Sequence, residues 1–166
     1  MRVEKISILK FIDHWVGGPI CIGLVLLYRL THPFFRVHLS VPQQDLPPKK
    51  ILIMKFFGIG SITLASSLVT NIRNKYPDTK IYFMTFKENR EILEILALAD
   101  QVVIIDSKNP FVLLKSIISG VFFCHRAKID IVLDIEFYSK FSTIMTFLSG
   151  ARWRVGFYLA RFKIVC

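Results

Sequence analysis

Residues 50–61 read Lys-Ile-Leu-Ile-Met-Lys-Phe-Phe-Gly-Ile-Gly-Ser, and this stretch decides the fold. Its apolar run, 51–54, is short and stands directly before a glycine turn, which is typical of a strand buried on both faces. From Ser61 to Lys75 the apolar side chains recur at helical spacing, and Tyr76-Pro77-Asp78 ends that pattern. A buried strand, a glycine turn and a helix are the opening unit of a parallel α/β sheet.

The alternation of strand and helix continues along the chain. Further strands are expected at 80–85, 101–106, 129–134 and 153–157, and further helices at 88–97, 110–126 and 139–148. Pro110 would stand in the first turn of its helix, where proline is tolerated. Strands that alternate with helices form parallel sheets with right-handed crossovers. The sequence therefore predicts an α/β fold with a Rossmann-like, doubly wound parallel sheet.

The composition limits the class of protein. The chain of 166 residues suits one domain, and with 53% hydrophobic and 20% charged residues it is not disordered. Its formal net charge of +10 favours phosphate groups on a ligand or a membrane. The basic residues are spread along the chain, so nucleic acid is not expected as a partner. Cysteines and histidines lack metal-ligand spacing, and neither a metal site nor a cofactor is predicted.

Residues 1–40 form an apolar segment that we expect to be helical and to associate with a membrane. Its uncharged core, 15–28, is shorter than the roughly 20 residues that span a bilayer, and Gly17-Gly18-Pro19 would break its first turn. Basic and aromatic flanks suit an anionic membrane surface. An in-plane or re-entrant anchor is favoured over a spanning anchor or a helix packed on the domain. The proline-rich residues 41–49 are expected to be a linker to the domain at 50–166.

Candidate binding residues lie where strands end, because ligands of such sheets bind beyond the carboxyl ends of the strands. Gly58, Gly60 and Ser61 open a helix, whose free N–H groups attract anions. Lys87 and Lys140 follow later strands. A dinucleotide site would need a third glycine where Thr63 stands. The alternative is that the glycines only permit a tight turn and that the hydroxyl of Ser61 caps the helix.

Two acidic residues follow the fourth strand. Asp134 and Glu136 stand two positions apart, which places both on one face of an extended segment at the ligand edge. Paired carboxylates can divide the roles of general acid and base, so both are candidate catalytic bases. The alternative is structural: Asp134 would cap a loop and Glu136 would pair with Lys140.

Together these segments resemble glycosyltransferase family 9, the ADP-heptose:lipopolysaccharide heptosyltransferases. The resemblance rests on residues 50–61, Leu64-Ala65, Tyr76-Pro77-Asp78, 130–134 and 148–157. Residues 12–21 also look like the leader of some family members. The resemblance implies that this domain is the N-terminal, acceptor-side half of a GT-B fold, which has two Rossmann-like domains. It also implies an inverting, metal-free transfer in which a carboxylate deprotonates the acceptor hydroxyl.

The sequence departs from the family at two points. Ser61 stands where the family has an acid, so Asp134 or Glu136 would have to serve as the base. The chain ends at Cys166, where the family continues into a donor domain. We therefore expect a truncated or partial glycosyltransferase of lipopolysaccharide or another envelope glycan, inactive on its own. A non-catalytic module that binds a lipid-linked saccharide or a partner subunit is the alternative.

The expected partners follow from the same resemblance. They are a lipid-linked saccharide acceptor, an anionic membrane surface and, only if a second domain is supplied, a nucleotide-sugar donor. The expected location is the cytoplasmic face of the bacterial inner membrane, where the chain would be peripheral or monotopic.

Overall fold

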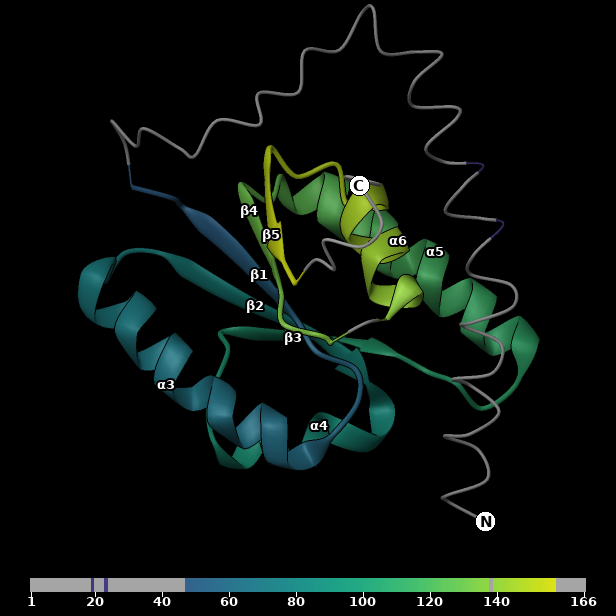
Figure 1. The fold of residues 1–166 in the computed structure, drawn as a ribbon, viewed down its shortest axis with the longest axis horizontal. Coiled ribbons are helices and arrows are strands. Elements are labelled where there is room, and N and C mark those ends of the chain that lie inside the picture. The colour runs from purple at the N-terminus through teal and green to yellow at the C-terminus, as the bar shows by residue number, and fades with distance from the viewer. Residues whose placement is uncertain (1–18, 20–22, 24–46, 138, 158–166) are drawn as a thin grey trace, which may run out of the picture.

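The computed structural model describes residues 19, 23, 47–137 and 139–157 (Figure 1). Most of the expected apolar segment and linker lies outside these residues. Within them a parallel sheet has the strand order β3-β2-β1-β4-β5. The strands are β1 (Lys50–Met54), β2 (Lys80–Phe86), β3 (Gln101–Ile105), β4 (Ile131–Asp134) and β5 (Trp153–Gly156). The expected Rossmann-like, doubly wound sheet is confirmed.

Helices cover both faces of the sheet (Figure 1). On one face lie α3 (Ile59–Lys75) and α4 (Arg90–Ile95), the latter preceded by the 3₁₀ turn η1 (Lys87–Asn89). On the other face lie α5 (Pro110–Ala127) and α6 (Lys140–Leu148). The central strands are almost completely buried because helices pack on both of their sides. This burial explains why β1 reads as a continuous apolar run.

The core divides at the sheet into two apolar layers. One layer joins Leu52 and Met54 of β1 to Cys124 of α5 and Met145 of α6. The other joins alternate residues of the same strands to α3 and α4. Burial raises the pKa of the Cys124 thiol to about 11, so this cysteine behaves as a small apolar side chain.

Two helices differ from the prediction. The first begins at Ile59 instead of Ser61, with Gly58 as its N-cap and no side-chain cap, so Ser61 does not cap the helix. The second is split, because η1 winds more tightly than the α4 helix that follows it. Pro110 does stand in the first turn of α5, where Asn109 caps the helix by accepting from the N–H of Val112.

A glycine corner positions β5 at the edge of the sheet. Gly150 has a φ of 67°, and a Cβ at this position would lie 2.5 Å from Cε1 of His125. Nε2 of His125 lies 3.0 Å from the carbonyl oxygen of Leu148. His125 therefore ties the end of α5 to the end of α6, which is a structural role.

Carboxylates hold the amino ends of the strands. An oxygen of Asp130 accepts from the backbone N–H groups of Lys49 and Lys50, at 3.0 and 2.9 Å. Asp100 accepts from the N–H of Ile81 at 2.7 Å. These bonds fix where β1 and β2 enter the sheet.

Candidate functional site

The candidate site lies where the chain leaves β1 and β4. These two strands are neighbours, yet β1 leads to α3 on one face of the sheet and β4 leads to α6 on the other. The strand order therefore reverses between them, and ligands of doubly wound folds bind at this switch point. The loop 55–58, which follows β1, contains Gly58, and the loop after β4 contains Glu136.

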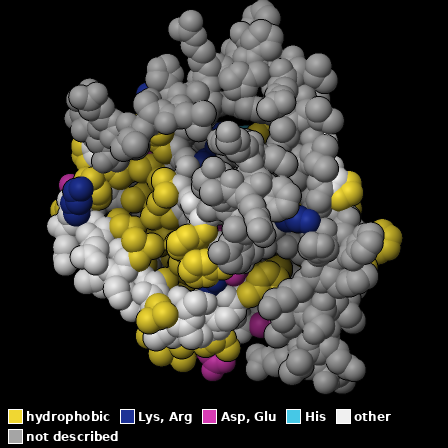
Figure 2. All heavy atoms as spheres, in the orientation of Figure 1, with side chains coloured by type: hydrophobic (Ala, Val, Ile, Leu, Met, Phe, Trp, Pro, Cys, Tyr) yellow, Lys and Arg dark blue, Asp and Glu magenta, His cyan; other side chains and the backbone are white. Residues whose placement is uncertain are grey.

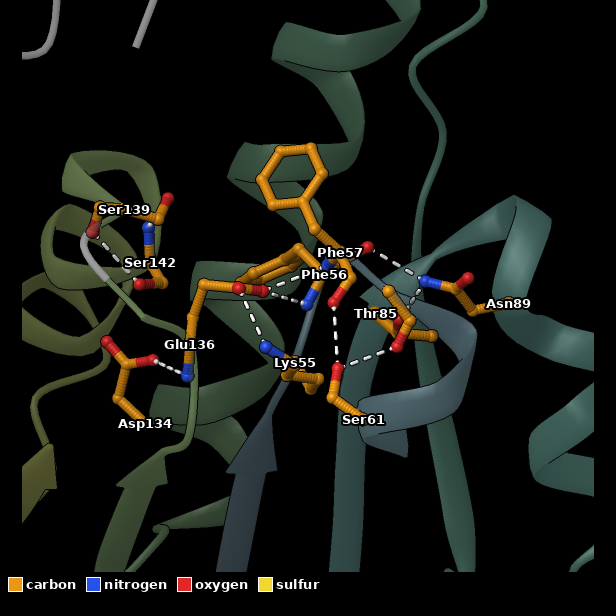
Figure 3. Close-up of polar contacts among 11 residues, drawn as sticks. Lys55, Phe56, Phe57, Ser61, Thr85, Asn89, Asp134, Glu136, Ser139 and Ser142 are labelled. Carbon is orange, nitrogen blue, oxygen red and sulfur yellow. Dashed lines mark hydrogen bonds and ion pairs between the residues drawn. The ribbon is translucent and has the colours of Figure 1, made fainter. Parts of the chain in front are cut away.

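Glu136 joins these two loops (Figure 3). Its Oε1 lies 2.7 Å from Nζ of Lys55, and its Oε2 accepts the backbone N–H groups of Phe56 and Phe57, both at 2.9 Å. The side chains of Lys55 and Glu136 are only 4% and 5% exposed, so the ion pair is removed from water. Both carboxylate oxygens are thus engaged by the loop 55–58.

Asn89 holds the same loop from the opposite side (Figure 3). Its amide nitrogen donates to the carbonyl oxygen of Phe56 at 2.8 Å and to the Thr85 hydroxyl at 2.9 Å. Asn89 ends the η1 turn after β2 and is buried. The segments after β2 and β4, the two strands that flank β1, therefore supply side chains that fix the backbone of residue 56 through both its N–H and its C=O.

The two glycines of the turn have different structural roles. Gly58 has a φ of 85°, a conformation that favours glycine, and a Cβ there would lie 2.9 Å from the Ser61 hydroxyl oxygen. Gly60 lies in the first turn of α3, and a Cβ there would meet nothing within 4 Å. The Ser61 hydroxyl donates to the carbonyl oxygen of Gly58 at 2.7 Å. A tight turn therefore requires Gly58 but gives no reason for Gly60.

Asp134 ends β4 beside this network. Its Oδ1 accepts the N–H of Glu136 at 3.0 Å, and its Oδ2 lies 3.4 Å from the Thr146 hydroxyl. The pKa of Asp134 is raised, mainly because the carboxyl group is buried and also because of the charge of Glu136. Hydrogen bonds from the Glu136 N–H, Ser142 and Thr146 oppose this shift but do not cancel it. Asp134 and Glu136 are therefore brought together, as the sequence indicates, in two different environments.

The two predicted lysines lie at the same edge of the sheet but in other surroundings. Lys87, directly after β2, is mostly exposed, and its Nζ lies 3.1 Å from Oδ2 of Asp106. Asp106 also accepts the N–H of Lys108, and the hydrogen bond from Lys87 is the first cause that lowers its pKa. Lys140 is the first residue of α6 and is half-buried. The roles of both in binding remain predictions.

Sequence reasoning missed Lys55 and Asn89. A lysine directly after an apolar strand resembles a solvent-exposed strand end, whereas Lys55 is buried and contacts Glu136 across a gap of 81 positions. Asn89 lies within a stretch with helical spacing and gives no separate signal. A charged residue within an otherwise continuous apolar run, Ile51 to Phe57, was the available indication for Lys55.

Two aromatic rings lie exposed at the ends of β4 and β5. The rings of Phe137 and Phe157 stack with centroids 4.2 Å apart, and Nζ of Lys55 lies 5.6 Å from the Phe137 centroid. In the face shown in Figure 2, hydrophobic side chains gather in the middle and left of the view, whereas Lys and Arg stand singly. Among the described residues no group of three or more His, Cys, Asp or Glu is placed to hold a metal ion.

The bonds between Glu136 and the loop 55–58 give a double-mutant prediction. Glu136→Gln keeps a carbonyl oxygen for the two N–H groups but leaves the Lys55 ammonium buried without a counter-charge, which should cost about 3–5 kcal/mol of unfolding free energy. Lys55→Met together with Glu136→Gln removes that charge and keeps the N–H bonds. The double variant should therefore be more stable than Glu136→Gln alone, as measured by urea denaturation. If the double variant lost as much stability as Glu136→Gln and Lys55→Met lose separately and in sum, the proposed bonding of Glu136 to the loop 55–58 would be contradicted.

The burial of Asp134 gives a prediction about pH. The pKa of Asp134 is raised above its ordinary value of 3.8. There is therefore a pH interval above 3.8 in which the folded state keeps the proton that the unfolded state has released. The wild-type protein therefore loses stability as the pH rises through that interval. Asp134→Asn lacks this loss, so its stability relative to wild type should increase from pH 4 to pH 7 in urea denaturation.

Asp106→Asn is the matched control for this measurement. The pKa of Asp106 is lowered, so its contribution to stability is present above 3.8 and is lost as the pH falls. The relative stability of Asp106→Asn should thus stay constant from pH 4 to pH 7 and rise only as the pH falls below 3.8. Parallel pH profiles for the two variants would refute the assigned burial effect.

Comparisons with known proteins bear on the fold of this site. A scan against protein-family models finds no matching family, and a search of curated proteins finds no relative. A search of solved structures finds the glycosyl transferase family 9 from Veillonella parvula DSM 2008, with a TM-score of 0.61 and 16% sequence identity over 72% of this chain and 34% of that one. The chain therefore spans about a third of that protein's length. At this identity the likeness establishes a common Rossmann-like fold.

Proposed function

We propose that this chain is the acceptor-binding half of a glycosyltransferase that resembles the heptosyltransferases. The observation that carries the proposal is the match of 72% of this chain to about a third of a family 9 glycosyl transferase, at a TM-score of 0.61. Such partial coverage fits one Rossmann-like half of a GT-B fold. The family motifs of the sequence, from residue 50 to residue 157, support the same assignment.

The proposed acceptor is a phosphorylated, lipid-linked saccharide of the cell envelope, such as a lipopolysaccharide precursor. The net charge of +10 supports an anionic ligand, and the apolar residues 1–40 support work at the cytoplasmic face of the inner membrane. A nucleotide-sugar donor would be bound by a second domain, as in GT-B enzymes. The acceptor would reach the carboxyl edge of the sheet, where α3 presents its free N–H groups.

Asp134 is the proposed general base. Both oxygens of Glu136 are engaged by Lys55, Phe56 and Phe57, so this carboxylate is committed to the loop. A raised pKa makes Asp134 a stronger proton acceptor than an ordinary carboxylate once it is ionised. The Ser61 hydroxyl donates a hydrogen bond to the carbonyl oxygen of Gly58. Its oxygen can therefore accept a hydrogen bond from a hydroxyl group of the saccharide.

A non-catalytic module that binds a lipid-linked saccharide is the second candidate. It is favoured by Ser61, which stands where the resemblance leads one to expect an acid, and by the burial of Asp134, which is 7% exposed. The two candidates agree that this chain binds the acceptor and differ in whether Asp134 acts on it.

Acceptor binding can be tested at the two glycines. Gly60→Ala adds a methyl group to open space beside the N–H groups of α3, so it should keep or raise stability by up to about 1 kcal/mol. It should weaken acceptor binding roughly tenfold, about 1.4 kcal/mol. The measurement is titration calorimetry with a deacylated, phosphorylated lipopolysaccharide core oligosaccharide. In wild-type protein the amide NMR signals of Gly58, Gly60 and Ser61 should shift during the same titration.

Gly58→Ala separates loop strain from ligand contact. Alanine at a φ of 85° should cost roughly 1–2 kcal/mol of stability through backbone strain.

Unmoved NMR signals from residues 58–61 at a saturating oligosaccharide concentration would contradict the proposed acceptor site. The chain alone should also transfer no sugar from a nucleotide-sugar donor, and measured turnover would overturn its assignment as an acceptor-binding half.

A further inference from the structure

Helix α5 is apolar on two faces. Its inner face packs on the sheet, where Cys124 is buried and a Cβ on Gly120 would lie 3.1 Å from Cδ1 of Ile105. Its outer face carries large apolar side chains at helical spacing that are open to solvent. These are Phe111, Leu114, Ile118 and Phe122, which are 87%, 56%, 60% and 65% exposed. We call these four residues the outer stripe.

The outer stripe is not a general property of helices in this fold. The outward positions in the middle of α3 are polar and include Thr63, Ser67 and Asn71. Its exposed large apolar residues, Ile59 and Leu64, do not form a row along the helix. Among the described helices, α5 alone is long and apolar enough, by length and composition, to cross a membrane. Because its inner face packs on the sheet, α5 could contact lipid only with its outer face.

Charge selects the partner of the outer stripe. Between Asp106 and Asp130 the sequence contains no acidic residue. It contains basic residues at both ends of α5 and beside the stripe, namely Lys108, Lys115, Arg126 and Lys128. Lys115 and Arg126 are exposed on the helix itself. An apolar stripe with a basic border is the pattern of helices that lie in the interface of an anionic bilayer.

The same charges argue against two other occupants. A second copy of this chain that paired through the stripe about a two-fold axis would bring the same basic borders together. The apolar segment 15–28 is preceded by Lys10 and Asp13 and followed by Arg29, so its borders offer no net negative charge to the basic border of α5. Headgroup phosphates attract both elements.

We propose that the outer stripe of α5 is a membrane-contact surface that lies in the plane of an anionic bilayer. The four apolar side chains enter the boundary between headgroups and acyl chains, and the bordering lysine and arginine residues contact lipid phosphates. This surface belongs to the folded domain and is additional to any contact made by residues 1–40. It does not depend on the proposed transferase function, because it requires no saccharide.

The test is sedimentation of the full chain with lipid vesicles. Leu114→Ser/Ile118→Ser/Phe122→Ser should lower the partition coefficient for phosphatidylglycerol-containing vesicles at least tenfold, because it replaces exposed apolar side chains with polar ones. The matched control is Leu64→Ser/Ile95→Ser on α3 and α4, whose residues are 75% and 71% exposed. This control should bind as wild type does. Binding of wild type should weaken on vesicles of phosphatidylcholine alone and in high salt.

Circular dichroism and thermal unfolding should show that the stripe variant is folded, since the replaced side chains are exposed. If it is not folded, Lys115→Glu/Arg126→Glu provides the same test through the basic border and should weaken binding to anionic vesicles several-fold. Binding equal to wild type by every folded variant would overturn the proposal. A change in oligomeric state without a change in lipid binding would overturn it in favour of self-association.

Discussion

The bond network of Glu136 is the constraint on which the candidate site depends. Doubly wound sheets open a crevice where the strand order reverses, and in this chain the reversal lies between β1 and β4. At that point Glu136 joins the loop after β4 to the loop 55–58 by binding Lys55 and two backbone N–H groups. A buried ion pair alone is weak support for a fold, because desolvation offsets the attraction. Here the two N–H bonds satisfy the rest of the carboxylate, and they set the direction in which the chain enters α3.

A consequence is that the position of Gly58 and Ser61 is determined from several strands at once. Glu136 comes from the end of β4, Asn89 from the turn after β2, and the loop itself from β1. No buried side-chain nitrogen or oxygen of the described residues lacks a hydrogen-bond partner, the side chains around the loop included. The loop can therefore present the first turn of α3 in one fixed orientation, which is what a site for an anionic group requires.

The sequence predicts the fold well because the strands are buried and the helices are amphipathic. Every predicted strand and helix within the described residues exists, and most of their ends fall within two positions of the predicted ones. The start of α3 is predicted two residues late, because Ser61 resembles a cap while the actual N-cap is Gly58. The network of Lys55, Asn89 and Glu136 is not predictable from local pattern, since the bonds of Asn89 and Glu136 to residues 55 and 56 span 33 to 81 positions. Sequence places Glu136 at the carboxyl edge of the sheet, but it suggests the nearby Lys140 as its partner, whereas the ion pair in the structure is with Lys55.

The proposed acceptor site and the proposed membrane surface are compatible in geometry. Residues 106–109 lead directly from the end of β3 into α5, so Phe111 lies near the carboxyl edge of the sheet and Arg126 near the amino edge. Helix α5 therefore runs from the edge that carries the loop 55–58 toward the opposite edge. If its outer stripe rests on a bilayer, α5 lies between the lipid and the sheet, so the loop 55–58 stands one helix diameter, roughly 10 Å, from the lipid surface. A saccharide anchored in the same leaflet would therefore have to extend past the start of α5 to reach the first turn of α3, which lies over the opposite face of the sheet.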